Sequence, residues 1–161
     1  MIKVGDQLPT MTLMTPTANG PEQIDTGTFF AGKTVALFAV PGAFTPTCSV
    51  RHLPGFLDHA DQFRAKGVDV IACLAVNDVF VLDAWEKSQN SAGRITMLAD
   101  GSGDFTKALG LEFDLTARGL GVRSQRFALV ARGGVVTHLA VEAPGGFDVS
   151  SAEAVLAALN A

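Results

Sequence analysis

Apolar runs along the chain alternate with segments of helical periodicity, and this alternation predicts an α/β fold. The runs are short, continuous and bounded by turn residues, as expected of strands buried on both faces of a sheet. They occupy residues 34–40, 68–76, 95–99, 127–131 and 135–141. Because helical patterns separate the first three runs, those strands should be parallel and joined by right-handed crossovers.

The ends of the chain add antiparallel strands and a helix to this pattern. Residues 132–134, Arg-Gly-Gly, join the last two runs and predict a hairpin. A capping-box pattern at residues 150–153 predicts a terminal helix. We expect another hairpin or loose strands near residues 11–14, and irregular structure over residues 111–124. The chain is therefore predicted to form a mixed central sheet with helices on both faces.

The junction after the strand at residues 34–40 carries the candidate chemistry. Thr45 suits the N-cap of the next helix and Pro46 its first position. Cys48 then falls in the first turn, where free N–H groups and the helix dipole favour a negative charge. A thiol placed there is a candidate for a lowered pKa and a reactive thiolate. The alternative is a buried, inert cysteine, which is the common state of free cysteines.

Composition and charge narrow the class of protein. The length of 161 residues predicts one domain, residues 1–161, with a full core. A net charge of −4 argues against nucleic acid or an anionic membrane as the main partner. No apolar run reaches the ~18 residues of a transmembrane helix, and the N-terminus lacks a signal-peptide pattern. The two cysteines, Cys48 and Cys73, do not make a secreted disulfide framework. A reducing cytoplasm is therefore the predicted compartment.

The pattern Pro41-x-x-x-Thr45-x-x-Cys48 resembles the active-site motif of the peroxiredoxins, thiol peroxidases with a thioredoxin-like fold. The sequence is most similar to the peroxiredoxin-5, or type II, branch. That resemblance extends in order through residues 41–49, 52–56, 73–78, 98–101 and 119–127. It implies reduction of hydrogen peroxide and organic hydroperoxides, with Cys48 as the peroxidatic cysteine that becomes a sulfenic acid. No cofactor is expected, and no cluster of Cys, His and carboxylates has metal-ligand spacing.

Peroxide reduction requires hydrogen-bond donors around the sulfur of Cys48. Lowering a thiol pKa by ~3 units gains about 30-fold in thiolate but loses a similar factor in nucleophilicity. Charge must therefore be stabilised as the O–O bond breaks. The hydroxyl of Thr45 and the N–H of Cys48 are two donors. In resembling proteins an arginine also donates to the sulfur, and this arginine corresponds to Arg126. Arg123 is the second candidate for that role. The alternative for both residues is an ordinary surface charge. Pro41 is expected to shield the sulfur from water and to shape the pocket.

Cys73 admits two interpretations. Its place in an apolar run predicts a buried, inert thiol, but some resembling proteins, plant type II enzymes among them, have a cysteine there that could resolve the sulfenic acid of Cys48. A disulfide needs Cα atoms within about 7 Å, and we expect a core strand and a helix start to come that close only with local unfolding. Animal members carry a resolving cysteine near the C-terminus, and residues 147–151 contain none. We therefore expect an external thiol reductant, either glutathione with glutaredoxin or thioredoxin.

The three histidines are expected to have structural roles. His52 follows Cys48 by four residues and could face it on a continuous helix. We favour a histidine packed near a kink at Pro54, because a peroxidase needs no general base once the thiolate exists. His59 and His138 are interpreted as surface or sheet-face residues.

The resemblance also implies a homodimer that pairs through the loops around the active site. Phe44, Phe80 and the loop of Leu120 are the candidate contacts. Trp85, the single tryptophan, should lie in the core or an interface and report oxidation by its emission. Two other functions stay open. One is a thioredoxin-like disulfide exchanger, although the motif lacks a second cysteine, and the other is a redox sensor or chaperone that uses oxidation of the same cysteine.

Overall fold

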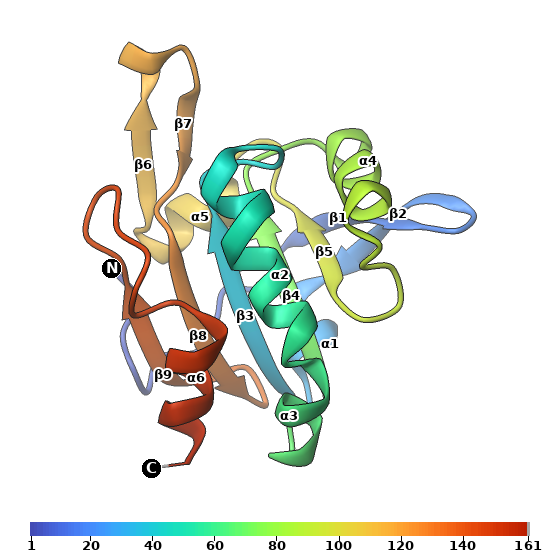
Figure 1. Cartoon of the computed structure of the whole chain (residues 1–161), viewed down its shortest axis with the longest axis vertical. Helices are drawn as coiled ribbons and strands as arrows, with labels where there is room; N and C mark the ends of the chain where they lie inside the picture. The colour runs from blue at the N-terminus through green and yellow to red at the C-terminus, as the bar shows by residue number, and fades with distance from the viewer. Residues whose placement is uncertain (161) are drawn as a thin grey trace.

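The computed structural model describes residues 1–160 and contains a seven-stranded mixed sheet in the order β2-β1-β5-β4-β3-β8-β9 (Figure 1). β3, β4 and β5 are parallel to one another, and the remaining pairs are antiparallel. This confirms the predicted parallel unit and the late hairpin. The strands are β1 (Thr12–Thr17), β2 (Gly20–Asp25), β3 (Thr34–Val40), β4 (Val70–Ala75), β5 (Thr96–Ala99), β8 (Phe127–Arg132) and β9 (Val135–Val141).

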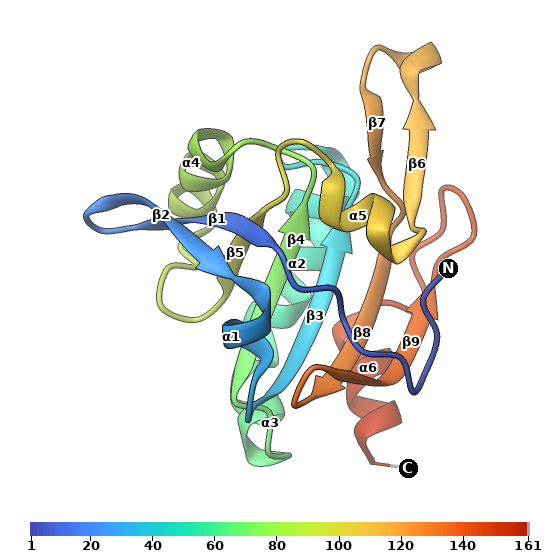
Figure 2. The same cartoon turned by 180° about the vertical axis from the view of Figure 1, so that it is seen from behind.

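Helices cover both faces of the sheet, and a separate apolar cluster fills the space on each side (Figures 1 and 2). One face carries α2 (Leu53–Asp58), α3 (Ala60–Ala65), α4 (Val79–Gln89) and α6 (Ala152–Leu159). The other carries α1 (Thr26–Phe30) and α5 (Asp104–Leu109). Along β3 alternate residues point to opposite clusters, with Phe38 on the α2 side and Leu37 on the α5 side. An apolar run without polar interruptions therefore fits a strand that is buried on both faces.

A row of stacked phenylalanines fixes α2 and α3 against β3. Phe38 and Phe56 stack with centroids 4.2 Å apart, and Phe56 and Phe63 with centroids 5.3 Å apart. All three side chains are fully buried. Each such pair contributes about 0.5–1.5 kcal/mol beyond the burial of its area. The row holds the helix that follows Cys48 at a fixed distance from the sheet.

The helix after β3 passes Pro54 without breaking. A π-helical turn, η1 (Cys48–His52), precedes α2, and the N–H of Leu53 bonds to the carbonyl of Cys48. A wider turn is one of the ways in which a helix accommodates a residue that lacks an N–H. A π-turn thus precedes Pro54 where a kink was predicted, and the helical dihedrals are interrupted at His59 (φ −105°, ψ 10°), between α2 and α3.

The prediction of irregular structure over residues 111–124 is wrong. β6 (Glu112–Leu115) and β7 (Gly121–Ser124) form a second, two-stranded sheet that projects from the body (Figure 1). η2 (Thr116–Arg118) lies at its tip. Strands of four residues show too few alternations for a period of two to be recognised in the sequence.

The terminal helix begins one residue later than the capping box suggested. Ser151 is the N-cap of α6 and accepts a hydrogen bond from the N–H of Ala154. The hydroxyl of Ser150 is directed instead to the carboxylate of Glu142. The hairpin of β1 and β2 confirms the predicted N-terminal strands. Within residues 1–160, no helix has both the length and the apolar character needed to cross a bilayer.

Candidate active site

The loop between β3 and η1 is braced by Arg123 of β7. Its Nε donates to the carbonyl of Leu120 (2.8 Å) and its Nη1 to the carbonyl of Pro41 (3.2 Å). A Cβ at Gly42 would lie 2.7 Å from Arg123 Nη1, so a side chain at this position would require the guanidinium to shift. Arg123, the runner-up for contact with the thiol, therefore holds the loop, and none of its hydrogen bonds reaches the sulfur.

The same loop is fixed on its other side by Asn77, the second residue after β4. The N–H of Ala43 donates to Asn77 Oδ1 (2.9 Å). Phe44 then takes a left-handed conformation with φ of 64°, which costs a non-glycine residue about 1–3 kcal/mol. This reversal brings the following residue, Thr45, back toward the end of β3, and leaves the Phe44 ring 55% exposed.

Cys48 lies fully buried at the start of the helix, and its sulfur has two polar partners. Thr45 Oγ1 is 2.8 Å from Sγ, and Arg126 Nη2 is 3.1 Å from it. The carbonyl of Thr45 accepts the N–H of Ser49, so helical bonding begins at Thr45 as predicted. Its hydroxyl, however, contacts the sulfur and the carbonyl of Gly42 (2.7 Å) in place of capping the helix.

The Thr45 hydroxyl is compatible with both protonation states of Cys48. A hydroxyl has one proton to donate, and it lies between two acceptors, the sulfur and the carbonyl of Gly42. When the sulfur is a thiol, its S–H can donate to Oγ1 while Oγ1 donates to the carbonyl. When the sulfur is a thiolate, the hydroxyl proton turns to it. Removal of the thiol proton therefore requires only a rotation of the hydroxyl.

Arg126 is held by His52 as well as by Cys48. Its Nη1 lies 2.8 Å from His52 Nδ1, and His52 Nε2 lies 2.8 Å from the carbonyl of Ser150. A guanidinium only donates, so Nδ1 is the acceptor and the proton of the imidazole resides on Nε2, where it is donated to Ser150. Burial, and then the charge of Arg126, lower the pKa of His52 to about 3. His52 is thus neutral, as expected of a packed histidine, and orients Arg126.

Glu142 fixes the loop that supplies the carbonyl for His52. Its Oε2 accepts the N–H of Asp148 (2.7 Å) and both the N–H (2.8 Å) and hydroxyl (2.7 Å) of Ser150. Burial opposes ionisation, but these hydrogen bonds outweigh it and hold the pKa of Glu142 below its usual value. The roles of Glu142 and Ser150 in the site were not predicted from the sequence. A glutamate at the end of an apolar strand has no distinctive pattern, and Ser150 was assigned only to the capping box.

A cleft of about 370 Å³ leads from the surface to Thr45 and Arg126. The sulfur of Cys48 lies behind these two side chains. The cleft is lined by Pro41, Thr45, Thr47, Phe113, Leu115, Arg118, Leu120, Gln125, Arg126 and residues 142–146. The β6–β7 hairpin forms one wall and the loop between β9 and α6 forms the other. Cys48, Thr45, Arg126 and Pro41, the four residues predicted for the site, therefore meet at one place.

Cys73 lies on β4, on the same face of the sheet as Cys48. Both cysteines are free and fully buried. Burial, followed by the electrostatic effect of the neighbouring Cys48, raises the pKa of the Cys73 thiol well above its usual value. Cys73 is therefore a protonated thiol inside the sheet. No group of three or more His, Cys, Asp or Glu residues within residues 1–160 is arranged to hold a metal ion.

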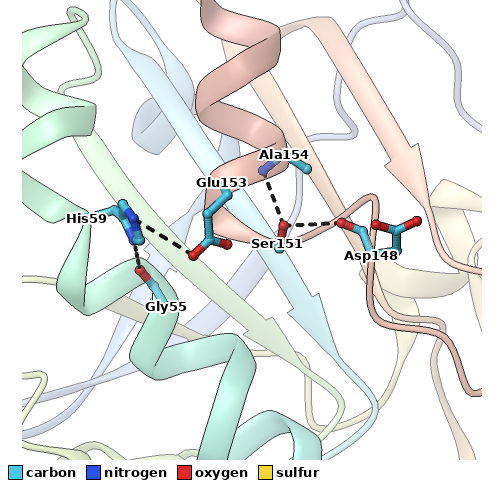
Figure 3. Close-up of polar contacts among 6 residues, drawn as sticks. All are labelled: Gly55, His59, Asp148, Ser151, Glu153 and Ala154. Carbon is cyan, nitrogen blue, oxygen red and sulfur yellow. Dashed lines mark hydrogen bonds and ion pairs between the residues drawn. The ribbon is translucent and has the colours of Figure 1, made fainter.

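The remaining histidines and the tryptophan have structural contacts outside the group around Cys48 Sγ. Figure 3 shows His59 between the carbonyl of Gly55 (2.8 Å from Nδ1) and the carboxylate of Glu153 (3.8 Å from Nε2), which ties α2 to α6. His138 is half-buried on β9. Trp85 is fully buried, as predicted, and its Nε1 donates to Ser49 Oγ (2.9 Å), next to the cysteine.

The neutral state of His52 makes stability depend on pH. The unfolded chain takes up a proton on this histidine below about pH 6.5, whereas the folded protein resists it down to about 3. The free energy of unfolding should therefore fall by about 2 kcal/mol between about pH 7 and pH 5 from this group alone. Urea unfolding of wild type and His52→Asn, whose amide can still accept from Arg126, checks this: the variant should show a flatter dependence. Identical slopes would contradict the neutral assignment.

Comparison with known proteins agrees with the geometry of the site. The model of the Redoxin family matches residues 3–156. Peroxiredoxin-2B of Arabidopsis thaliana is 49% identical over 98% of both chains. Peroxiredoxin-2E, chloroplastic, of the same plant is 49% identical over 98% of this chain and 69% of that protein. Reduced Prx3 of Vibrio vulnificus in complex with hydrogen peroxide is 57% identical over 99% of both chains, with a TM-score of 0.94.

These matches cover nearly the whole chain at identities well above those that show only a common fold. The mixed sheet and the buried thiol at the helix start after β3 are consistent with this similarity. The chain therefore belongs to the Redoxin family, in which it is a peroxiredoxin of the type II branch and a thiol-dependent peroxidase.

Proposed function

We propose that Cys48 is the peroxidatic cysteine and that Thr45 and Arg126 stabilise its reaction. The observation that carries this assignment is the pair of contacts to Sγ, from Thr45 Oγ1 and Arg126 Nη2. The guanidinium favours the thiolate because it is always charged and lies within hydrogen-bond distance of the sulfur. The same two donors line the cleft by which a peroxide reaches the sulfur.

The chemical step is a displacement on one oxygen of the peroxide. The Cys48 thiolate attacks the terminal OH oxygen of ROOH, the S–O bond forms, and the O–O bond breaks with its electron pair on the departing RO⁻. The sulfur is oxidised to sulfenic acid, and the departing RO⁻ takes one proton from solvent and becomes ROH. Charge moves from sulfur to the leaving oxygen, so donors that span both atoms stabilise the transition state more than the ground state. Arg126 can do this because its second nitrogen is fixed by His52.

The first experiment follows oxidation of the reduced protein by hydrogen peroxide through Trp85 emission. Cys48→Ser should abolish the fast phase. Arg126→Gln should slow it by about 10²- to 10³-fold, the cost of removing one preorganised donor. Arg132→Gln is a matched control, because it removes the same charge from an exposed position at the other end of β8.

A rate in the wild type no greater than that of free cysteine would overturn the assignment. It would favour the disulfide exchanger, if the pure protein reduces insulin, or the sensor, if oxidation of Cys48 changes a partner without turnover. Equal rates for wild type and Arg126→Gln would remove Arg126 from the mechanism.

We propose that an external thiol reduces the sulfenic acid. Cys73 is a protonated thiol in β4, where it pairs with β3 on one side and β5 on the other. Both cysteines are free thiols in this structure, and a disulfide between them would need its specific Cα separation and dihedral angle. Glutathione with glutaredoxin, or thioredoxin, would then supply the electrons. Its thiolate attacks the sulfenic sulfur, the S–O bond breaks and the oxygen leaves as water, and a second thiol reduces the resulting mixed disulfide.

Intact mass after one equivalent of peroxide tests this proposal. The product should gain one oxygen atom and react with a sulfenic-acid trap, and Cys73→Ser should turn over with glutathione and glutaredoxin, or with thioredoxin, as fast as wild type. Loss of two hydrogens, together with failure of Cys73→Ser to turn over, would instead identify Cys73 as the resolving cysteine.

We further propose a homodimer formed by the surface beside the active-site loop. Phe44, Val50 and Phe80 are 55%, 73% and 71% exposed, which is unusual for large apolar side chains. The bond from Ala43 to Asn77 joins the loop of Phe44 to the start of the helix that carries Phe80. Leu120, the third predicted contact, lines the cleft and is less available.

Sedimentation at micromolar concentration should give a dimer for wild type and a monomer for Phe80→Glu. Val4→Glu is the control, because it puts the same charge at an exposed apolar residue far from the loop in sequence. A wild type that is monomeric throughout would rule out a stable dimer. We also propose that the protein lies in the cytoplasm, whose reducing conditions suit two free thiols. Cell fractionation that found the protein only in an organelle would contradict this proposal.

A further inference from the structure

The cleft is much larger than hydrogen peroxide needs. Its volume of about 370 Å³ falls in the range of pockets that bind whole organic molecules. Its inner end contains the two donors of the reaction, Thr45 and Arg126, and its outer part reaches the tip of the β6–β7 hairpin at Arg118. A second group of the substrate can therefore be bound at a distance from the reacting oxygens.

The wall between these two ends is apolar. Phe113 and Leu115 alternate with exposed acidic residues on β6, so they share the face of the strand that lines the cleft. Leu120 continues this wall from the loop before β7. A hairpin with four paired residues on each strand spans roughly 13 Å at ~3.3 Å per residue. The wall thus suits an aliphatic or aromatic body of several carbon atoms.

Arg118 ends the 3₁₀ turn η2 at the tip of this wall. It is exposed and makes no ion pair within residues 1–160. The other charged residues that line the cleft are Arg126, directed to Cys48 and His52, and Glu142, whose Oε2 accepts three hydrogen bonds from its own loop. Arg118 is therefore the cleft's one charged group without an assigned partner among the described residues.

We propose that Arg118 binds the carboxylate of an organic hydroperoxide whose apolar body lies along Phe113, Leu115 and Leu120. The hydroperoxide group then reaches Arg126 and Thr45. This inference rests on the proposed function of Cys48, because the same displacement reduces ROOH to ROH while the carboxylate at the far end is unchanged. A planar guanidinium matches a carboxylate with two parallel hydrogen bonds. The substrate class is thus an amphipathic hydroperoxy acid, such as a hydroperoxide of a fatty acid.

The test compares a hydroperoxy fatty acid with its methyl ester, both below the concentration at which they form micelles. Wild type should be oxidised by the acid about two- to fivefold faster than by the ester, the gain of one exposed charge-assisted contact. Arg118→Gln should abolish this preference, Arg118→Lys should retain part of it, and Arg118→Glu should reverse it. Arg132→Gln, which removes the same charge outside the cleft, should behave as wild type.

Hydrogen peroxide separates this inference from the function on which it rests. Its rate should be the same in wild type and all Arg118 variants, because it cannot reach Arg118 and Arg126 together. A slow reaction with hydrogen peroxide in wild type would contradict the role of Cys48 itself. Equal rates for acid and ester with a fast hydrogen peroxide reaction would overturn only the role of Arg118. A third outcome would also overturn the proposal. If glutathione, but not dithiothreitol, re-reduced Arg118→Gln more slowly than wild type, and wild type showed no preference for the acid, Arg118 would bind a carboxylate of the reductant and not one of the peroxide.

Discussion

The guanidinium of Arg126 is the group on which the rest of the site depends. Taken partly out of water, its charge needs acceptors, and it has two: the sulfur of Cys48 and Nδ1 of His52. His52 can accept only as the neutral imidazole, and the carbonyl of Ser150 fixes that tautomer. Ser150 is in turn held by the carboxylate of Glu142. The chemistry of a cysteine near the start of the chain is thus tied to a loop near its end, through one continuous set of polar contacts.

The apolar packing of the fold and the polar contacts of the active site lie in different parts of the structure. The two apolar clusters and the stacked phenylalanines fix the sheet and the helix after Cys48. The strained and polar features, the left-handed Phe44 and the buried Glu142, lie instead at the ends of strands and in loops. A rigid core allows this strain to persist, because the loop is held from both sides by Arg123 and Asn77. The donors therefore meet the sulfur without rearrangement when a peroxide arrives.

Local sequence predicted the parts of the site that lie within one stretch of chain. β3, the turn and the cysteine follow one another, so their order alone indicated a reactive thiol at a helix start. Arg126 depended on family resemblance, since nothing in its own neighbourhood points to Cys48. The roles of Glu142 and Ser150, and the hairpin wall, arise from contacts between distant segments. Glu142 and Ser150 are eight residues apart, on either side of a loop, and neither has a pattern that a single sequence could separate from an ordinary surface residue or helix cap.

Gly42 and Arg123 occupy one shared volume, and this has an evolutionary consequence. The guanidinium nitrogen fills the space that any β-carbon at position 42 would need. A side chain there would displace the arginine from the carbonyl of Pro41 and release the cysteine loop. A side chain at position 42 therefore requires the arginine to shift or to be replaced by a shorter residue, whereas a shorter residue at position 123 leaves Gly42 unaffected. Among related chains the two sites, 81 residues apart, should covary as a pair, with a bulkier residue at the first accompanied by a shorter one at the second.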